Sequence, residues 1–376
     1  MSLTQAQRLK FQLFAGGLTI TRTARDSLEA AHRGSRLSSA DFASTSGLIL
    51  ELDDHVWVNA PIVDHNPNFV KRSDYVLDRD STGLFVSGAG LFSRARSWIP
   101  PTYHSQTTAD GLPMTNICVT HGDRARLSPI HGCGMACTFC DVPYGVRYGL
   151  KAISSMIEAV GAAVRDPVQP ARHLLISGGT PKKADIPWLK DVYRSILTEF
   201  PDVPVDIMMV PVDDLMDVDE LAKLGVNQLS INLELFSDEA ARRYMPHKAR
   251  LGDESYLDFI ERAAQRLGPG RVRSMLMVGL EPLSATLQGV GEIARRGGVP
   301  VLSPFRPDPS TPLRDHPPPT AEYLEKVFLE ATEILGSLGA SLGPCCLPCS
   351  HNTLTLHDLD SRHAYVVPGA MPHLCH

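Results

Sequence analysis

The sequence predicts an α/β fold built on a parallel sheet. From about residue 126 onward, short apolar runs alternate with longer segments whose apolar residues recur at helical spacing, which is the pattern of successive βα units. Six such units are present, too few to close an eight-stranded barrel. Periodicity alone therefore allows either a sheet curled into an incomplete barrel or an open, doubly wound sheet.

Each expected strand is a short apolar run, and each expected helix carries one apolar stripe. The six strands are expected at Arg126–Ile130, His173–Ser177, Val205–Val210, Gln228–Leu233, Arg273–Val278 and Val299–Ser303. The helical stripes lie within Ile153–Val164, Trp188–Leu197, Tyr256–Ala263 and Tyr323–Leu335. Right-handed crossovers between these units bring the carboxyl ends of the strands to one edge, where βα folds place their chemistry.

Residues 1–115 follow a different pattern. Strand-like pieces lie in Gly47–Ile62 and Tyr75–Phe92, and the acidic runs Asp53–Asp54 and Asp78–Asp80 predict turns between them. We expect a small accessory region of mixed helix and strand that packs on the βα region. It serves either as a structural cover or as a substrate-recognition domain.

Composition and charge exclude several classes of protein. Hydrophobic residues make up 43% and charged residues 21%, as in soluble globular proteins. The net charge of −6 gives no electrostatic case for nucleic acid. We find no apolar run long enough for a membrane span and no apolar core of a signal peptide near the N-terminus. Six of the eight cysteines form two tight clusters, which favours metal binding in a reducing compartment and hence a cytoplasmic protein.

The first cluster, Cys133, Cys137 and Cys140, is a CxxxCxxC run in the loop after the first expected strand. Three thiolates at this spacing can hold three irons of a [4Fe–4S] cluster and leave the fourth iron open to a small molecule. Zinc, with His131 or Cys118 as a fourth ligand, is the alternative.

The spacing, with Phe139 directly before the third cysteine, resembles the radical S-adenosylmethionine (radical SAM) superfamily. The resemblance covers roughly residues 126–335 and implies a partial (β/α)6 barrel. The expected boundaries are then an accessory region at 1–115, the barrel at 116–340 and a Cys-rich segment at 341–376. The resemblance also implies that the three cysteines hold a [4Fe–4S] cluster that binds SAM. An electron donor such as flavodoxin or ferredoxin would drive SAM cleavage and start radical chemistry on a small-molecule substrate.

Glycine and polar residues after later strands fit the same resemblance. In the family, a glycine-rich stretch after the second strand contacts the amino group of SAM. The resemblance assigns this role here to Gly178, Gly179 and Thr180. On the fourth strand, Ser230, Asn232 and Glu234 share one face by the two-residue strand period. Inward polar side chains need partners, which SAM would supply unless these residues satisfy one another.

Three residues at the last two strand ends complete the expected cofactor site. Gly279 corresponds to the strand end that faces the adenosine in the family. Glu281 would bind a ribose hydroxyl or a substrate amine, or would cap the helix that follows it. Arg306 would pair with a carboxylate or phosphate, or would form a structural ion pair.

The second cluster, Cys345, Cys346 and Cys349, follows the last expected helix. Four interpretations stay open: an auxiliary iron–sulfur cluster completed by His351, Cys118 or Cys375; capture of trivalent arsenic; a structural zinc site; and redox-active thiols. The Cys-Cys-Leu-x-Cys run resembles that of the arsinothricin-pathway radical SAM enzyme, which implies 3-amino-3-carboxypropyl transfer from SAM to arsenic. A non-catalytic, zinc-stabilised binding protein is the alternative outside the enzymes.

Overall fold

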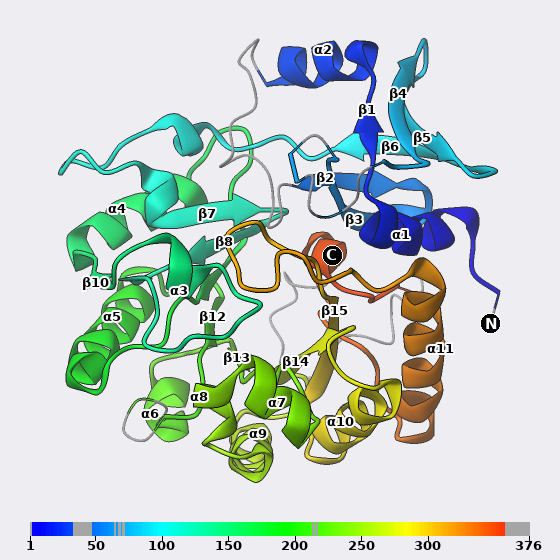
Figure 1. The fold of residues 1–376 in the computed structure, drawn as a ribbon. Helices are drawn as coiled ribbons and strands as arrows, with labels where there is room; N and C mark the ends of the chain where they lie inside the picture. Colours follow the sequence, from blue (N-terminus) through cyan, green and yellow to red (C-terminus); the bar gives the residue numbers. More distant parts are fainter. Residues whose placement is uncertain are drawn as a thin grey trace.

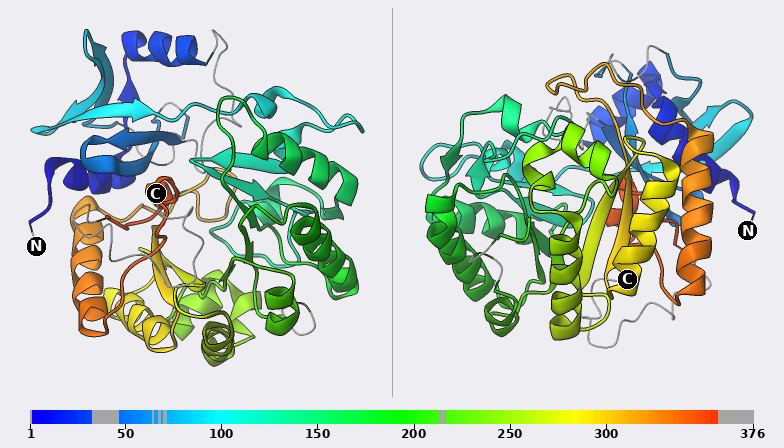
Figure 2. Two further views of the ribbon diagram at one scale, coloured as in Figure 1. Left: turned by 180° about the vertical axis from the view of Figure 1, so that it is seen from behind. Right: turned by 60° about the horizontal axis from the view of Figure 1, so that its bottom comes forward.

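The computed structural model describes residues 2–32, 47–63, 65, 66, 69, 72–212, 215 and 217–357. In this part of the chain, a seven-stranded sheet has the order β15-β14-β13-β12-β11-β8-β7 and a six-stranded sheet has the order β1-β4-β5-β6-β2-β3. A short β10-β9 pair stands apart from both. The larger sheet curls into an incomplete barrel with its helices on the outside (Figures 1 and 2).

The barrel sheet confirms all six expected strands. Its strands are β7 (Cys118–His121), β8 (Arg124–Leu127), β11 (His173–Ile176), β12 (Val205–Met208), β13 (Gln228–Ser230), β14 (Val272–Val278) and β15 (Val299–Pro304). The strands from β8 to β15 pair in parallel, and β7 adds an antiparallel edge to β8. The curl confirms the partial barrel and excludes the open, doubly wound sheet.

The longer helices cover the convex face of this sheet (Figure 1): α4 (Ile153–Val164), α5 (Ile186–Glu199), α9 (Asp253–Leu267), α10 (Leu283–Arg295) and α11 (Ala321–Ser337). The predicted apolar stripes are the faces that α4, α5, α9 and α11 bury. The shorter helices are α3 (Val142–Gly145), α6 (Val218–Lys223), α7 (Asp238–Tyr244) and α8 (Pro246–Ala249). In α11, Leu324, Val327 and Phe328 are buried, and the Thr320 hydroxyl accepts from Tyr323 N to begin the helix. The short pair consists of β9 (Ile130–His131) and β10 (Gly149–Leu150).

The N-terminal region is mixed helix and strand, as expected. It contains α1 (Gln5–Gly16), β1 (Thr19–Ile20), α2 (Arg22–Ala31), β2 (Gly47–Leu52), β3 (Val56–Pro61), β4 (Val76–Asp80), β5 (Gly83–Gly88) and β6 (Leu91–Ser97). The turn predicted at Asp78–Asp80 is wrong, because β4 continues through Asp80. The Asp80 carboxylate accepts from Thr82 N and from Arg94 Nη1, so it closes the turn from the strand end.

Short 3₁₀ helices in the described residues are η3 (Asp53–His55), η4 (Thr102–Ser105), η5 (Met114–Asn116), η6 (Lys183–Asp185) and η7 (Pro348–Asn352). The segment with η7, residues 341–357, enters the middle of the molecule between the barrel and the N-terminal sheet (Figure 1, red). Along the β15 edge, Gly343 N donates to Pro300 O at 2.9 Å and Leu354 N to Leu302 O at 2.8 Å. We call residues 341–357 the C-terminal segment.

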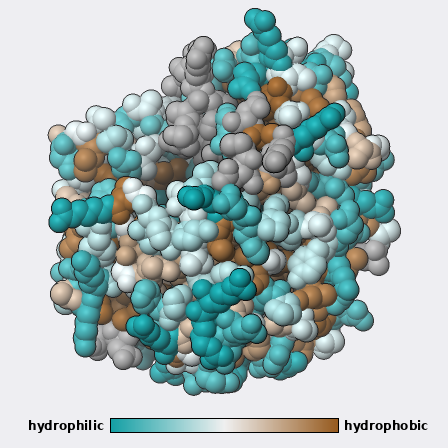
Figure 3. Space-filling view, viewed as in Figure 1, coloured by the Kyte–Doolittle hydropathy of each residue, from teal (hydrophilic) through white to brown (hydrophobic). Residues whose placement is uncertain are grey.

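The fully buried Lys10 of α1 ties this C-terminal segment to the N-terminal region. Its Nζ donates to Ser350 O at 3.1 Å and to Thr355 O at 2.7 Å. One hydrophobic core cluster extends from Leu3 to Leu354. The face seen in Figure 3 mixes hydrophilic and apolar side chains. Within the described residues, no helix has both the length and the apolarity needed to cross a membrane.

Candidate active site

The first cysteine cluster lies in the loop between β9 and α3, beyond the carboxyl end of β8. Cys137 is buried, and Cys133 and Cys140 are partly buried. Two backbone amides point at Cys133 Sγ, from Met135 at 3.3 Å and from Thr180 at 3.2 Å. Hydrogen bonds to cysteine sulfurs help to set the reduction potential of iron–sulfur clusters, so this loop suits thiolates that carry one.

The glycine turn after β11 packs directly against the cysteine loop. Gly134 N donates to Thr180 O at 2.9 Å. A Cβ on Gly179 would lie 1.8 Å from the Gly132 carbonyl oxygen and 2.7 Å from Cys133 Cα. Only glycine permits this approach. Gly179, which the resemblance assigned to SAM, therefore determines where the cysteine loop lies.

The opposite side of the loop rests on α7 and α8. Tyr244 O accepts from Thr138 N at 2.8 Å, and Ala136 N donates to His247 Nδ1 at 3.3 Å. The ring of Phe139 packs on a small apolar cluster that includes Cys137 and Phe305. Phe139 therefore has a packing role, because its contacts with this buried cluster hold the chain in place between Cys137 and Cys140.

Some of the polar side chains predicted on one face at the end of β13 form hydrogen bonds with one another and with the backbone. Ser230 Oγ donates to Asn232 Oδ1 at 2.9 Å, and the same oxygen accepts from Met275 N at 3.2 Å. Glu234 differs, because its Oε2 is buried without a hydrogen-bond partner among the described residues. Its backbone has φ +68°, a left-handed conformation that costs a non-glycine residue about 1–3 kcal/mol and is common at functional sites.

Lys248 of α8 completes this corner of the site, and the sequence analysis did not identify it. Its Nζ lies 3.3 Å from Glu234 Oε1 and 3.1 Å from Asn232 O. Burial acts to lower the pKa of Lys248, but the charges of Glu234 and Tyr256 outweigh it and raise that pKa to about 12. The ammonium is therefore charged at neutral pH. A lone lysine on a short helix carries no motif that would have revealed it.

The thiols of Cys137 and Cys140 are protonated at neutral pH when no metal is bound. Burial raises the pKa of Cys137 to about 11, against the opposing charge of Lys248. Burial likewise raises the pKa of Cys140 to about 12. A metal cluster binds thiolates, so its assembly must release these protons.

The remaining predicted cofactor residues have structural partners. Gly279, at φ +109°, leaves room for the Pro319 ring, which an added Cβ would meet at 3.1 Å. Glu281 accepts from Phe236 N and Ser237 N at 2.8 and 2.7 Å and from Thr286 Oγ1 at 3.0 Å. It thus anchors the start of α7 rather than capping the helix that follows it, because α10 has no side-chain cap at its start.

Arg306 lies at the junction of the barrel, the N-terminal sheet and the C-terminal segment. Its Nη1 donates to Asn59 O at 3.3 Å and its Nη2 to Asn352 Oδ1 at 2.8 Å. Both of these partners are uncharged, so neither contact is the structural ion pair that the sequence left open. Burial lowers the pKa of Arg306 to about 10.

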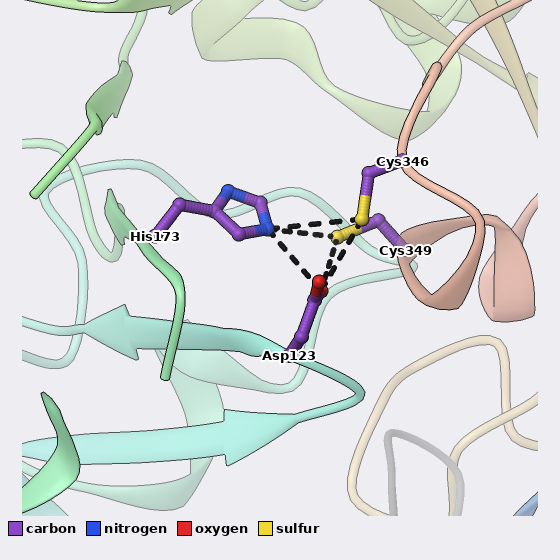
Figure 4. A group of neighbouring side chains, drawn as sticks. All are labelled: Asp123, His173, Cys346 and Cys349. Atoms are coloured by element: carbon purple, nitrogen blue, oxygen red, sulfur yellow. Dashed lines mark hydrogen bonds and ion pairs between the residues drawn. The ribbon is translucent and has the colours of Figure 1, made fainter. Parts of the chain in front are cut away.

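Only two of the three cysteines of the second cluster lie in one group of possible metal ligands. Cys346 and Cys349 meet Asp123 and His173, and the four ligand atoms lie within 4.8 Å of one another (Figure 4). Cys345 is not in this group. The sequence analysis missed Asp123 and His173, because residues 50 positions apart at the starts of two strands form no motif.

The two clusters lie at opposite ends of the barrel strands. Asp123 directly precedes β8 and His173 is the first residue of β11, so the second group lies at the amino ends. The cysteine loop follows the carboxyl end of β8. A cavity of about 10 Å³ borders the second group and is lined in part by Arg124, Asp206 and Arg273. A further cavity, of about 550 Å³, lies in the N-terminal region beside α2, and its described lining includes none of these cysteines.

Comparison with known proteins identifies a domain within the barrel. The model of the radical SAM superfamily matches residues 127–285. The bacteriochlorophyllide c C-7(1)-hydroxylase of Chlorobaculum limnaeum is 27% identical over 227 residues, which cover 54% of this chain and 56% of the hydroxylase. The match thus spans about half the length of that curated relative. Residues 127–285 form a radical SAM domain.

Comparison with solved structures gives TM-scores below 0.5 for the following two matches. A radical SAM methyltransferase from Sphaerobacter thermophilus has a TM-score of 0.49 and 15% identity, covering 72% of this chain and 76% of the methyltransferase. SuiB from Streptococcus suis has a TM-score of 0.46 and 12% identity, covering 63% of this chain and 52% of SuiB.

Proposed function

We propose that the protein cleaves SAM reductively at a [4Fe–4S] cluster held by Cys133, Cys137 and Cys140, and thereby starts radical chemistry on a small molecule. The observation that carries the proposal is the cysteine loop itself. Its three thiols lie beyond the carboxyl end of β8, and a glycine turn fits against it with no space for a side chain. When bound, the cluster and SAM supply a carbon radical that takes hydrogen from an unactivated carbon.

The chain's own residues position this chemistry and keep water out. The apolar cluster around Cys137 and Phe305 shields one side of the loop. Glu234 presents an unpartnered buried oxygen, which suits a hydroxyl or ammonium donor on a bound ligand. Lys248 balances the charge of Glu234 and fixes the orientation of its carboxylate. Gly178, Gly179 and Thr180 would approach the cofactor with backbone groups rather than side chains.

The substrate that we propose is a small organic molecule, and the electron donor a flavodoxin or ferredoxin. The hydroxylase relative is described by its action on a bacteriochlorophyllide, which supports a non-macromolecular substrate. The many reduced cysteines support a reducing compartment such as the cytoplasm.

Transfer of a SAM fragment to arsenic has less support from the geometry. That reaction needs the second cysteine cluster to face SAM. Cys346 and Cys349 instead contact His173, at the amino end of β11. The glycine turn begins four residues later along the chain, a rise of about 13 Å at the usual strand spacing.

The test is SAM cleavage by anaerobically reconstituted protein with a chemical reductant. We expect the wild type to release 5′-deoxyadenosine and Cys137→Ala to release none, because the cluster loses one of its three ligands. Cys345→Ser, outside both groups, is the matched control and should retain cleavage. Turnover by Cys137→Ala would contradict the site. Release of 5′-methylthioadenosine would instead support the transfer reaction.

A further inference from the structure

We propose that Asp123, His173, Cys346 and Cys349 bind one structural zinc ion that fastens the C-terminal segment to the amino end of the barrel. The site is separate from the SAM site and does not depend on the proposed reaction. Its four ligands come from the β7–β8 turn, the start of β11 and the C-terminal segment (Figure 4).

The distances between the ligand atoms match a tetrahedron around one small ion. Bonds of about 2.0–2.3 Å to zinc place tetrahedral ligands about 3.3–3.8 Å apart. Asp123 Oδ1 lies 3.2 Å from Cys346 Sγ, 3.7 Å from Cys349 Sγ and 3.4 Å from His173 Nε2. His173 Nε2 lies 3.8 Å from Cys346 Sγ and 3.3 Å from Cys349 Sγ. Five of the six edges therefore fall within about 0.1 Å of the expected range, and the sixth, between the two sulfurs, is no longer than 4.8 Å.

Hydrogen bonds alone do not account for this group. Two thiols and one imidazole nitrogen carry three hydrogens at most, whereas five contacts join the four atoms. Asp123 Oδ1 would accept from all three neighbours at once. A central cation satisfies the four lone pairs without any of these hydrogens.

The ligand types and the available space favour zinc over an iron–sulfur cluster. Two thiolates, one imidazole and one carboxylate are a donor set that zinc takes in tetrahedral geometry. The cysteines of a cubane bind different irons, so their sulfurs and any other ligand do not converge on one point. The adjacent cavity of about 10 Å³ has room for about one water-sized particle, and not for a cubane.

The surroundings balance the charge of such an ion. Two thiolates and a carboxylate around Zn²⁺ leave one net negative charge, and Arg124 lines the same cavity. The neighbouring Arg273 and Asp206 neutralise each other at 2.9 Å. Cys346, Cys349 and His173 are at most 6% exposed and the side chain of Asp123 is 13% exposed, so the site is largely shielded from solvent, as structural zinc sites are.

The test measures metal content in full-length protein whose first cluster has been removed by the triple substitution C133A, C137A and C140A. We expect one zinc per chain, and a fall of at least about tenfold when Cys349→Ser or His173→Gln is added. Cys345→Ser, a cysteine adjacent to the ligands, should keep the zinc. A chelator should lower the Tm of the triple variant and not that of the variant that also carries Cys349→Ser.

A second measurement avoids the risk that a ligand variant fails to fold. Co²⁺ substituted into the triple variant should give tetrahedral ligand-field bands and thiolate charge-transfer bands. Iron with acid-labile sulfide in the triple variant would overturn the proposal in favour of an auxiliary cluster. So would a metal-free protein, or a Cys346–Cys349 disulfide found by mass spectrometry. None of these results depends on whether SAM is cleaved.

Discussion

Replacing Gly179 with alanine tests whether the glycine turn determines the position of the cysteine loop. The new Cβ would lie 1.8 Å from Gly132 O, whereas carbon and carbonyl oxygen approach to about 3.3 Å. One of the two segments must therefore move by about 1.5 Å. A displacement of about 1 Å at a catalytic centre costs on the order of 100-fold in rate. We expect Gly179→Ala to lose at least that factor in SAM cleavage, together with part of its iron.

The assay compares iron, sulfide and 5′-deoxyadenosine release in reconstituted wild type, Gly179→Ala and Gly145→Ala. Gly145 ends α3 just beyond the cysteines, has no positive φ and has no atom within 4 Å of an added Cβ. The Gly145→Ala control should therefore behave as wild type. Circular dichroism checks that both variants fold. Full iron content and wild-type cleavage in folded Gly179→Ala would refute the reasoning.

Two further predictions concern buried charge. Burial lowers the pKa of Lys10 to about 7, against 10.5 unfolded, so this lysine's contribution to stability rises as pH increases from 7 towards 10.5. The unfolding free energy of Lys10→Met relative to wild type should fall by about 2 kcal/mol between pH 7.5 and 9 in urea titrations; a constant difference would contradict this. Arg273→Met leaves the carboxylate of Asp206 buried without its partner at 2.9 Å, at a cost of about 3–5 kcal/mol. Adding Asp206→Asn should recover part of that loss, and equal losses in the single and double variants would count against the pairing.

The barrel was predictable because its strands are buried on both faces. Such strands are continuous apolar runs, and the helices between them show stripes at a period of 3.6 residues. The cysteine loop and the glycines after β11 could also be predicted from the sequence. Each is a short contiguous motif within a few residues of the end of a predictable strand. The turn expected at Asp78–Asp80 failed because Asp80 forms hydrogen bonds from a strand position.

The second metal group could not be predicted as a set. Cys346 and Cys349 stood out by their spacing, but Asp123 and His173 are single polar residues joined to them only by the curl of the sheet. Cys345 shares the same short run and yet lies outside the group. Lys248 was missed for the same reason, because its partner Glu234 is 14 residues away and only the folded loop brings them together.

The link between Lys10 and the C-terminal segment has a consequence for the order of folding during synthesis. The carbonyls that Lys10 binds lie 340 and 345 residues further along the chain. The N-terminal region therefore emerges from the ribosome first but holds an unpartnered buried amine until nearly the whole chain has been made. We expect it to stay incompletely packed until then, and to depend on chaperones during that delay. The first and last described parts of the protein thus reach their final structure together.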